Sequence, residues 1–126
     1  MARKKKKKVR IHADWLIETL VGVVNESQED GPSITLAIGG MLVSGQMVTA
    51  ERYYRAVLPF ADKQITDAMK ELREEDSMYI HLQKAQFFFS GDAPPIPTTS
   101  EQPDFFRAKL SAVDGFMTAR LAVAKT

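Results

Sequence analysis

The chain has 126 residues, a formal net charge of +1 at pH 7 and no cysteine. This length suits one domain with a single hydrophobic core. The lack of cysteine excludes disulfides, thiol nucleophiles and thiolate zinc sites, and no apolar run is long enough to span a bilayer, so we expect a soluble protein of the cytoplasm.

The near-neutral total conceals a basic beginning. Residues 1–10 hold seven of the 17 Lys and Arg and no acid, whereas the remaining ten bases and 16 acids give the rest of the chain a charge of −6. Consecutive like charges repel and bury no apolar surface, so we predict that residues 1–12 form a disordered polybasic tail. The tail could bind nucleic acid, an acidic membrane or an acidic protein surface, including a second copy, or could only solubilise the chain. Its central lysines are Lys4, Lys5, Lys6, Lys7 and Lys8.

A helix is predicted at the start of the body. Asp14 can cap it, and Gly31 and Pro32 stop it after about Gln28. Its apolar residues recur at helical spacing, so we expect the helix to pack across the open end of a small barrel. They are Leu16, Leu20, Val23 and Val24, with Ile17 and Val21 widening the stripe and Trp15 at the start.

Two short strands are predicted between Ile34 and Val48, joined by Gly39-Gly40. A glycine pair permits positive φ at both central positions, which suits a two-residue hairpin. Gly45 inside the second strand indicates a sharp bend or a close approach of two backbones, as small barrels require. This segment therefore predicts a small antiparallel sheet.

Residues 50–76 are predicted to form one or two inserted helices. Thr49 can cap the first helix, and Pro59 ends it because proline lacks a backbone donor. Asp62 is predicted to cap the second helix. The apolar face of this second helix consists of Ile65, Met69 and Leu72.

The next strand is predicted at Met78–Phe89. Its apolar residues change parity along the way, which requires a bulge near Lys84 and Ala85. His81 falls on the polar side of this strand, so we expect a solvated histidine rather than a metal ligand.

The last third of the chain alternates between loop and strand signals. Residues 90–104 are rich in proline and small polar residues and predict a long exposed loop. Two final strands, Phe105–Val113 and Phe116–Val123, are predicted to pair through a hairpin at Asp114-Gly115.

Together these elements predict an α+β fold. Residues 13–126 form one domain, a small bent antiparallel β-sheet or barrel of about five strands. An N-terminal helix, the inserted helices of residues 50–76 and the proline-rich loop of residues 90–104 complete it.

Reaction chemistry is not indicated anywhere in the sequence. His12 and Asp14 lie two positions apart, so their side chains point to different sides. The three glycines near the hairpin join strand to strand and lack the Gly-Lys-Ser/Thr ending of a phosphate-binding loop. We therefore predict no enzyme activity, no cofactor and no catalytic, cofactor-binding or metal-binding residue. Structural turns are assigned to Gly39, Gly40, Gly45, Asp114 and Gly115.

Phenylalanines concentrate in the second half of the chain. Aromatic residues at strand spacing usually belong to a core, but adjacent phenylalanines cannot all face inward from a regular strand. Stacking on nucleobases therefore stays open as a second role. Besides the lysine run, the candidate interaction residues are Phe88, Ile96 and Phe105.

Five segments, in this order and spacing, carry a resemblance to a known family. They are Ile34–Gly45, Tyr53-Tyr54, Tyr79–Phe88, Pro95-Ile96-Pro97 and Arg107–Phe116. On these segments the chain resembles the gas vesicle accessory protein U family. It departs from the family in its polylysine start and at Phe106 and Ala108, where a Trp-Arg-Gly-like run is expected.

The resemblance implies an accessory role in forming, stabilising or clustering cytoplasmic gas vesicles, without catalysis or cofactor. The expected partners are the vesicle shell, other gas vesicle proteins and further copies of the chain. The bent strands and glycine positions are also similar to SH3-like and Sm-like small barrels, some of which bind RNA. An RNA-binding small barrel is therefore the alternative function.

Overall fold

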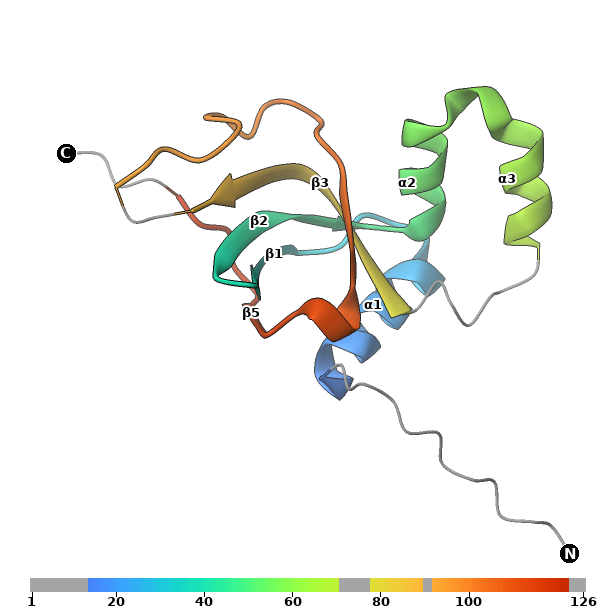
Figure 1. Cartoon of the computed structure of the whole chain (residues 1–126). Helices are drawn as coiled ribbons and strands as arrows, with labels where there is room; N and C mark the ends of the chain where they lie inside the picture. The colour runs from blue at the N-terminus through green and yellow to red at the C-terminus, as the bar shows by residue number, and fades with distance from the viewer. Residues whose placement is uncertain (1–13, 71–77, 90–91, 123–126) are drawn as a thin grey trace, which may run out of the picture.

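A computed structural model describes residues 14–70, 78–89 and 92–122 of the chain (Figure 1). The expected polybasic tail lies outside these residues. The elements in chain order are α1 (Trp15–Ser27), β1 (Ser33–Ile38), β2 (Met41–Val48), α2 (Ala50–Val57), the 3-10 turn η1 (Pro59–Ala61), α3 (Asp62–Met69), β3 (Tyr79–Phe88), β4 (Phe106–Lys109), the 3-10 turn η3 (Leu110–Ala112) and β5 (Gly115–Met117).

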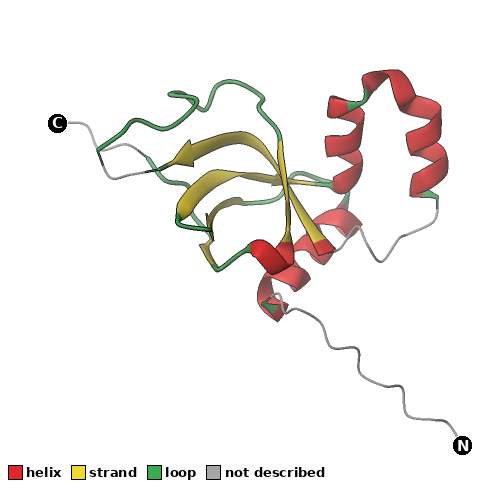
Figure 2. Cartoon of the chain, viewed as in Figure 1, coloured by secondary structure: helices red, strands yellow, loops and turns green. Residues whose placement is uncertain are grey.

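The strands form one antiparallel sheet in the order β4-β3-β2-β1-β5. Helix α1 lies against this sheet, and α2 and α3 stand together beside it (Figure 2). The α+β prediction of a small bent sheet with an N-terminal helix is confirmed. The described strands do not close into a barrel, because β4 and β5 lie at opposite edges and do not pair with each other.

The predicted glycine hairpin is confirmed at the turn between β1 and β2. Gly39 and Gly40 have φ values of +55° and +83°, which suit a two-residue turn that follows the twist of the strands. The Asp114 side chain accepts a hydrogen bond from the Gly39 amide at 3.0 Å, and the Asp114 amide donates to the Ala37 carbonyl at 2.7 Å. Asp114 therefore attaches the start of β5 to this turn.

The predicted bulge is confirmed near Lys84. Pairing between β2 and β3 shifts between Ser44 and Gln46, and Lys84 has a φ of +55°. A Cβ atom on Gly45 would lie 3.0 Å from the Gln83 carbonyl oxygen, so glycine permits the close approach of the two strands. The bulge explains how β3 changes the parity of its buried residues.

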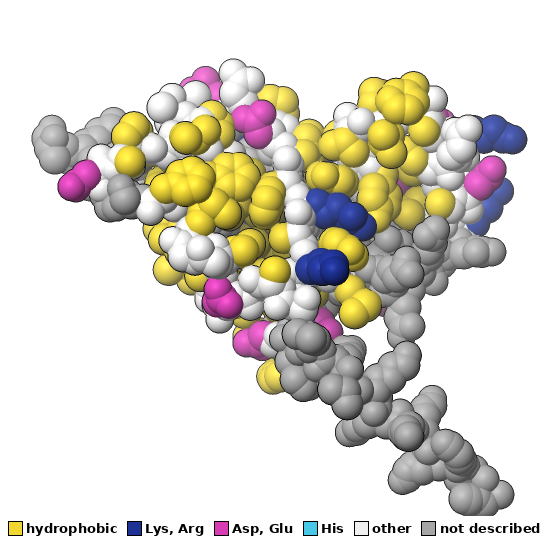
Figure 3. Space-filling model, in the orientation of Figure 1, with side chains coloured by type: hydrophobic (Ala, Val, Ile, Leu, Met, Phe, Trp, Pro, Cys, Tyr) yellow, Lys and Arg dark blue, Asp and Glu magenta, His cyan; other side chains and the backbone are white. Residues whose placement is uncertain are grey.

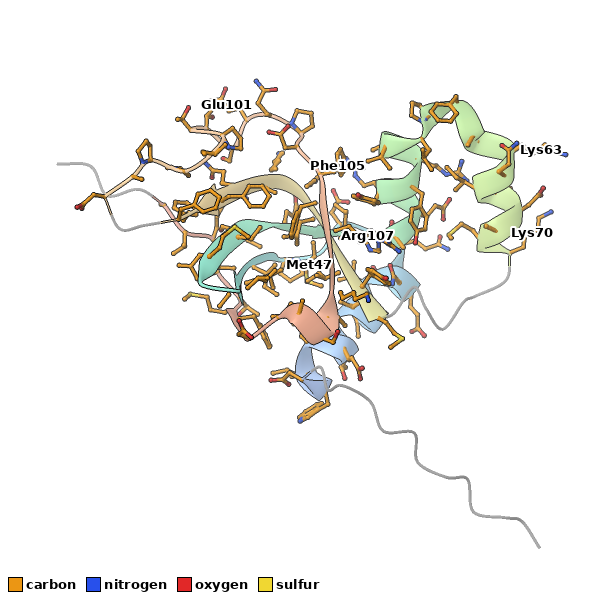
Figure 4. All side chains as sticks on the ribbon, viewed as in Figure 1. Met47, Lys63, Lys70, Glu101, Phe105 and Arg107 are labelled. Atoms are coloured by element: carbon orange, nitrogen blue, oxygen red, sulfur yellow. The ribbon has the colours of Figure 1, made fainter. Side chains whose placement is uncertain are left out.

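The hydrophobic core lies between α1 and one face of the sheet. Asp14 caps α1 as predicted, accepting a hydrogen bond from the Leu16 amide at 2.8 Å. In Figure 4, Met47 lies within the sheet above α1. The main core side chains are Ile17, Val21 and Val24 from α1, Ile34, Leu36, Val43, Met47, Ile80 and Leu82 from the sheet, and Leu110 from η3.

The prediction for the buried stripe of α1 is partly wrong. Ile17, Val21 and Val24 are buried at positions i, i+4 and i+7, while Leu16 and Val23 are 45% and 58% exposed. Since the side of the helix that carries these three residues faces the sheet, Leu16 and Val23 lie on a neighbouring side that is exposed. Trp15 is also exposed.

The predicted hairpin between two final strands is wrong. β4 pairs with β3, and β5 pairs with β1 at the other edge of the sheet. Leu110 is buried in the core, and its 3-10 turn carries the chain across the sheet instead of back along β4. Asp114 and Gly115 therefore do not close a hairpin, and the last strand ends at Met117.

The inserted helices are confirmed as α2 and α3. The Thr49 side chain caps α2 by accepting a hydrogen bond from the Arg52 amide at 3.0 Å. The predicted cap at Asp62 is wrong, because Asp62 is the first residue of α3 and its carboxylate pairs with Arg55. Ile65 is buried as expected, whereas residues 71–76 of the predicted insertion, including Leu72, lie outside the described residues.

Candidate interaction surfaces

The face of the sheet opposite the core carries mostly polar side chains, and part of it is covered by the chain itself. Thr35 and Ser44 are paired neighbours on this face, with their hydroxyl oxygens 3.0 Å apart. The Thr35 hydroxyl donates to the Ala119 carbonyl at 2.7 Å, and the Leu121 amide donates to the Ser44 hydroxyl at 2.9 Å. Residues 119–121 thus lie across β1 and β2 and satisfy hydroxyl groups that are withdrawn from water.

The other part of the polar face packs against α2 through a group that we call the His81–Arg107 cluster. Arg107 Nε donates to His81 Nε2 at 3.1 Å, and an Arg107 terminal nitrogen donates to the Tyr54 hydroxyl at 3.3 Å. The Arg107 guanidinium also lies 3.7 Å from the centre of the Tyr79 ring, in a cation–π contact. The cluster comprises Tyr53, Tyr54, Tyr79, His81, Phe105 and Arg107.

The prediction that His81 is solvated is wrong. Its side chain is 2% exposed and packs against the rings of Tyr53 and Tyr54, whose centres lie 4.9 and 5.6 Å away. Burial, and to a lesser extent the positive charge of Arg107, lower the pKa of His81 from 6.5 to about 4. The imidazole is therefore neutral at pH 7 and accepts the Arg107 hydrogen bond.

This geometry makes the cluster a structural joint between α2 and the sheet. Figure 4 shows Arg107 between the β4 segment and α2, with Phe105 further up the same segment. The Nε2 lone pair of His81 is already used by Arg107, so this nitrogen is not presented to a substrate as a base. Within the described ranges, no three His, Asp or Glu side chains gather in a way that could hold a metal ion.

The predicted interaction residues are not all brought together. Phe88 is half-buried at the end of β3 opposite Leu42, and Ile96 forms an isolated bridge with Phe87 beside the same strand. Phe105 is half-buried against the Tyr53 ring near α2, with the ring centres 6.1 Å apart. Lys4 to Lys8 lie outside the residues that the structure describes.

An apolar surface surrounds the end of β3, and we call it the β3-end patch. Figure 3 shows hydrophobic side chains gathered over this end of the strand and the loop that follows it. Phe89 is 57% exposed and Ile96 is 61% exposed. The patch comprises Phe89 and Ile96. Leu42 and Phe88 form a pair on the opposite face of the sheet and are not part of it.

A second apolar surface lies at the connection between α2 and α3, where Figure 3 also shows hydrophobic side chains. Phe60 is 83% exposed there, and Val57 and Leu58 are exposed beside it. These three residues are not among the predicted interaction residues. The available signal was an apolar run on both sides of Pro59 at a helix end, where a turn exposes its side chains.

None of the helices among the described residues has the length and apolarity needed to cross a bilayer. The sequence model of a family described as "Gas vesicle protein GvpU-like" matches residues 14–121. No curated protein and no solved structure matches the chain.

Proposed function

Because the chain belongs to the GvpU-like family of gas vesicle proteins, we propose that it is a non-enzymatic accessory protein that acts in the assembly, stabilisation or clustering of gas vesicles. It works by associating with itself and by contacting the vesicle shell, and its place in the cell is the cytoplasm beside the vesicles. The partner on this view is the shell or another gas vesicle protein.

The observation that carries shell contact is the β3-end patch. Phe89 and Ile96 each leave more than half of a large apolar side chain in water. Contiguous exposed apolar surface is unfavourable for a protein that stays alone, and it is typical of binding sites. The patch is therefore our candidate for the contact with the shell.

The patch is held in place by the backbone beneath it. The Phe87 and Ile96 amides each donate to the other residue's carbonyl, at 2.8 and 2.9 Å. The Phe87 ring packs edge-on against Phe106, with the ring centres 5.1 Å apart. Because these contacts already hold Ile96 beside β3, binding would cost little additional ordering of this residue.

Charge supports self-association. Residues 1–10 carry seven bases and no acid, whereas the remainder carries ten bases and 16 acids. Opposite charges on the two parts of the chain attract one copy to another, and added salt screens this attraction. We expect assemblies that grow with protein concentration and loosen with salt or with deletion of Arg3 to Arg10.

Co-flotation with isolated gas vesicles tests shell contact. The vesicles rise on gentle centrifugation and carry bound protein with them. We expect the wild-type chain to float and the double variant Phe89→Ser, Ile96→Ser to lose most of its bound fraction. Phe60→Ser is the matched control, because it removes an equally large exposed apolar side chain outside the patch. Equal binding by the double variant and the control, or no flotation of the wild type, would contradict shell contact through this patch.

The RNA-binding alternative stays a prediction with its own outcome in a parallel assay. It requires single-stranded RNA to bind, and the affinity to fall steeply with salt and with Phe88→Ala. The half-buried packing of Phe88 opposite Leu42 leaves less of its ring open to a base than an open stacking platform would. We therefore favour the vesicle role.

A further inference from the structure

Helix α1 carries a second apolar stripe beside the one that enters the core, and Leu20 of this stripe packs against the edge of the core. Leu16 and Val23 are 45% and 58% exposed, and half-buried Leu20 lies between them at position i+4. Residues at i, i+4 and i+7 lie on one side of a helix and form the seam along which two helices pack. Trp15, which is 70% exposed, extends the apolar surface at the start of the helix.

The charges around α1 favour a second copy of the same helix as the partner of this stripe. From Asp14 to Val48 the sequence contains five acids and no Lys or Arg, and Glu26, Glu29 and Asp30 follow one another at the end of the helix. Residues 3–10, which are separated from the helix by residues 11–14, contain seven bases and no acid. The net charge is therefore positive before α1, where the seven bases outnumber Asp14 and Glu18, and negative at the end of the helix.

Two copies of such a helix are complementary when they lie antiparallel. The 13 residues of α1 span about 20 Å at 1.5 Å per residue, so the start of one helix would lie next to the end of the other. In this orientation the positive charge that precedes one helix is attracted to Glu26, Glu29 and Asp30 of the second copy. A parallel arrangement would instead place the two basic segments together, where they repel.

From these observations we infer that α1 is a homodimer seam, in which Leu16, Leu20 and Val23 pack against the same residues of a second copy in antiparallel orientation. Leu16 of each copy faces Val23 of the other, and Leu20 lies near the two-fold axis. This inference deepens the self-association part of the proposed function and rests on it. A seam of one short helix is small, so the dimer dissociates on dilution, and the flanking charges make it sensitive to salt.

Sedimentation of the full chain over a range of concentrations tests the seam. We expect Val23→Glu to raise the dimer dissociation constant at least tenfold. Phe60→Glu makes the same charge change at an exposed apolar residue outside α1, and we expect its dissociation constant to stay within twofold of the wild type. Raising the salt concentration should weaken the wild-type dimer and should have less effect once residues 3–10 are deleted.

Disulfide trapping tests the orientation, since the chain has no cysteine of its own. A mixture of the Leu16→Cys and Val23→Cys variants should form a heterodimeric disulfide under mild oxidation, because the antiparallel seam brings these positions together. Each variant alone should crosslink with itself far more slowly. Fast self-crosslinking of Leu16→Cys would refute the antiparallel arrangement.

The two levels of the proposal fail in different ways. A wild-type chain that sediments as a monomer at every concentration would overturn self-association and the seam together, while flotation would still report on shell contact. A wild-type chain that associates as strongly as its Val23→Glu variant would overturn the seam alone.

Discussion

The buried His81 predicts an acid-sensitive fold. Its pKa is lowered from 6.5 to about 4, first by burial and then by the charge of Arg107. Between these two pH values the unfolded chain binds a proton at this position and the folded chain does not. The stabilising contribution is therefore complete above about pH 6.5 and is lost as the pH falls toward 4.

The magnitude follows from the two pKa values. One pKa unit corresponds to about 1.4 kcal/mol, so the full shift contributes about 3 kcal/mol to the free energy of unfolding. Lowering the pH from 7.5 to 5 should remove about 2 kcal/mol of this contribution. The side chain is 2% exposed, so solvent screens the effect little.

The variant His81→Gln isolates this contribution, because glutamine has no charge to gain and keeps an acceptor for Arg107. Both chains carry His12→Gln, so that His81 is the only histidine in the reference. Urea unfolding at pH 7.5 and pH 5 should show that the reference loses about 2 kcal/mol more than the variant. Carboxylate effects are common to both chains and cancel in this difference.

A direct measurement of the pKa completes the test. NMR titration of the imidazole should place the pKa of His81 near 4, and Arg107→Gln should raise that pKa by removing the nearby cation. An equal loss of stability in the two chains, or a pKa near 6.5, would refute the assignment of His81 as a neutral buried acceptor.

Three further predictions concern the backbone of the sheet and of α1, and urea unfolding measures each. Gly40→Ala should destabilise the fold by about 1–2 kcal/mol because its φ is +83°, whereas Gly22→Ala in α1 should stabilise it by about 0.5–1 kcal/mol, and the same sign for both would contradict the argument. Gly45→Ala should cost about 1–3 kcal/mol, since the added Cβ meets a β3 carbonyl at 3.0 Å; an unchanged midpoint would show that the strands yield freely. Asp114→Ala should cost about 1 kcal/mol and speed hydrogen exchange at the Gly39 amide, and unaltered exchange would mean that this hydrogen bond does not protect the turn.

Local signals in the sequence were sufficient for the elements that depend on a few neighbouring residues. The Gly39-Gly40 hairpin, the caps at Asp14 and Thr49 and the bulge near Lys84 are all confirmed. Each rests on one backbone conformation or one side-chain acceptor, and the residue types that supply these are few.

Features that depend on distant partners were predicted less well. Asp114-Gly115 is a strong hairpin signal, yet burial of Leu110 sends the chain across the sheet, and no local pattern reports that choice. His81 alternates with apolar residues, as a solvated side chain would, but α2 covers that face and supplies its tyrosines. The exposure of Phe60 at the helix connection is likewise decided by what fails to pack over it.

The separation of β4 and β5 affects how the nascent chain folds. β1 is synthesised early. Its outer edge stays unpaired until β5 (Gly115–Met117), which follows β4 in the chain, has been synthesised and pairs with it. An unpaired strand edge is a template for wrong partners, and pairings between remote segments form slowly. Chains translated side by side from one mRNA would therefore be most prone to wrong strand pairing in the interval before β5 is in place.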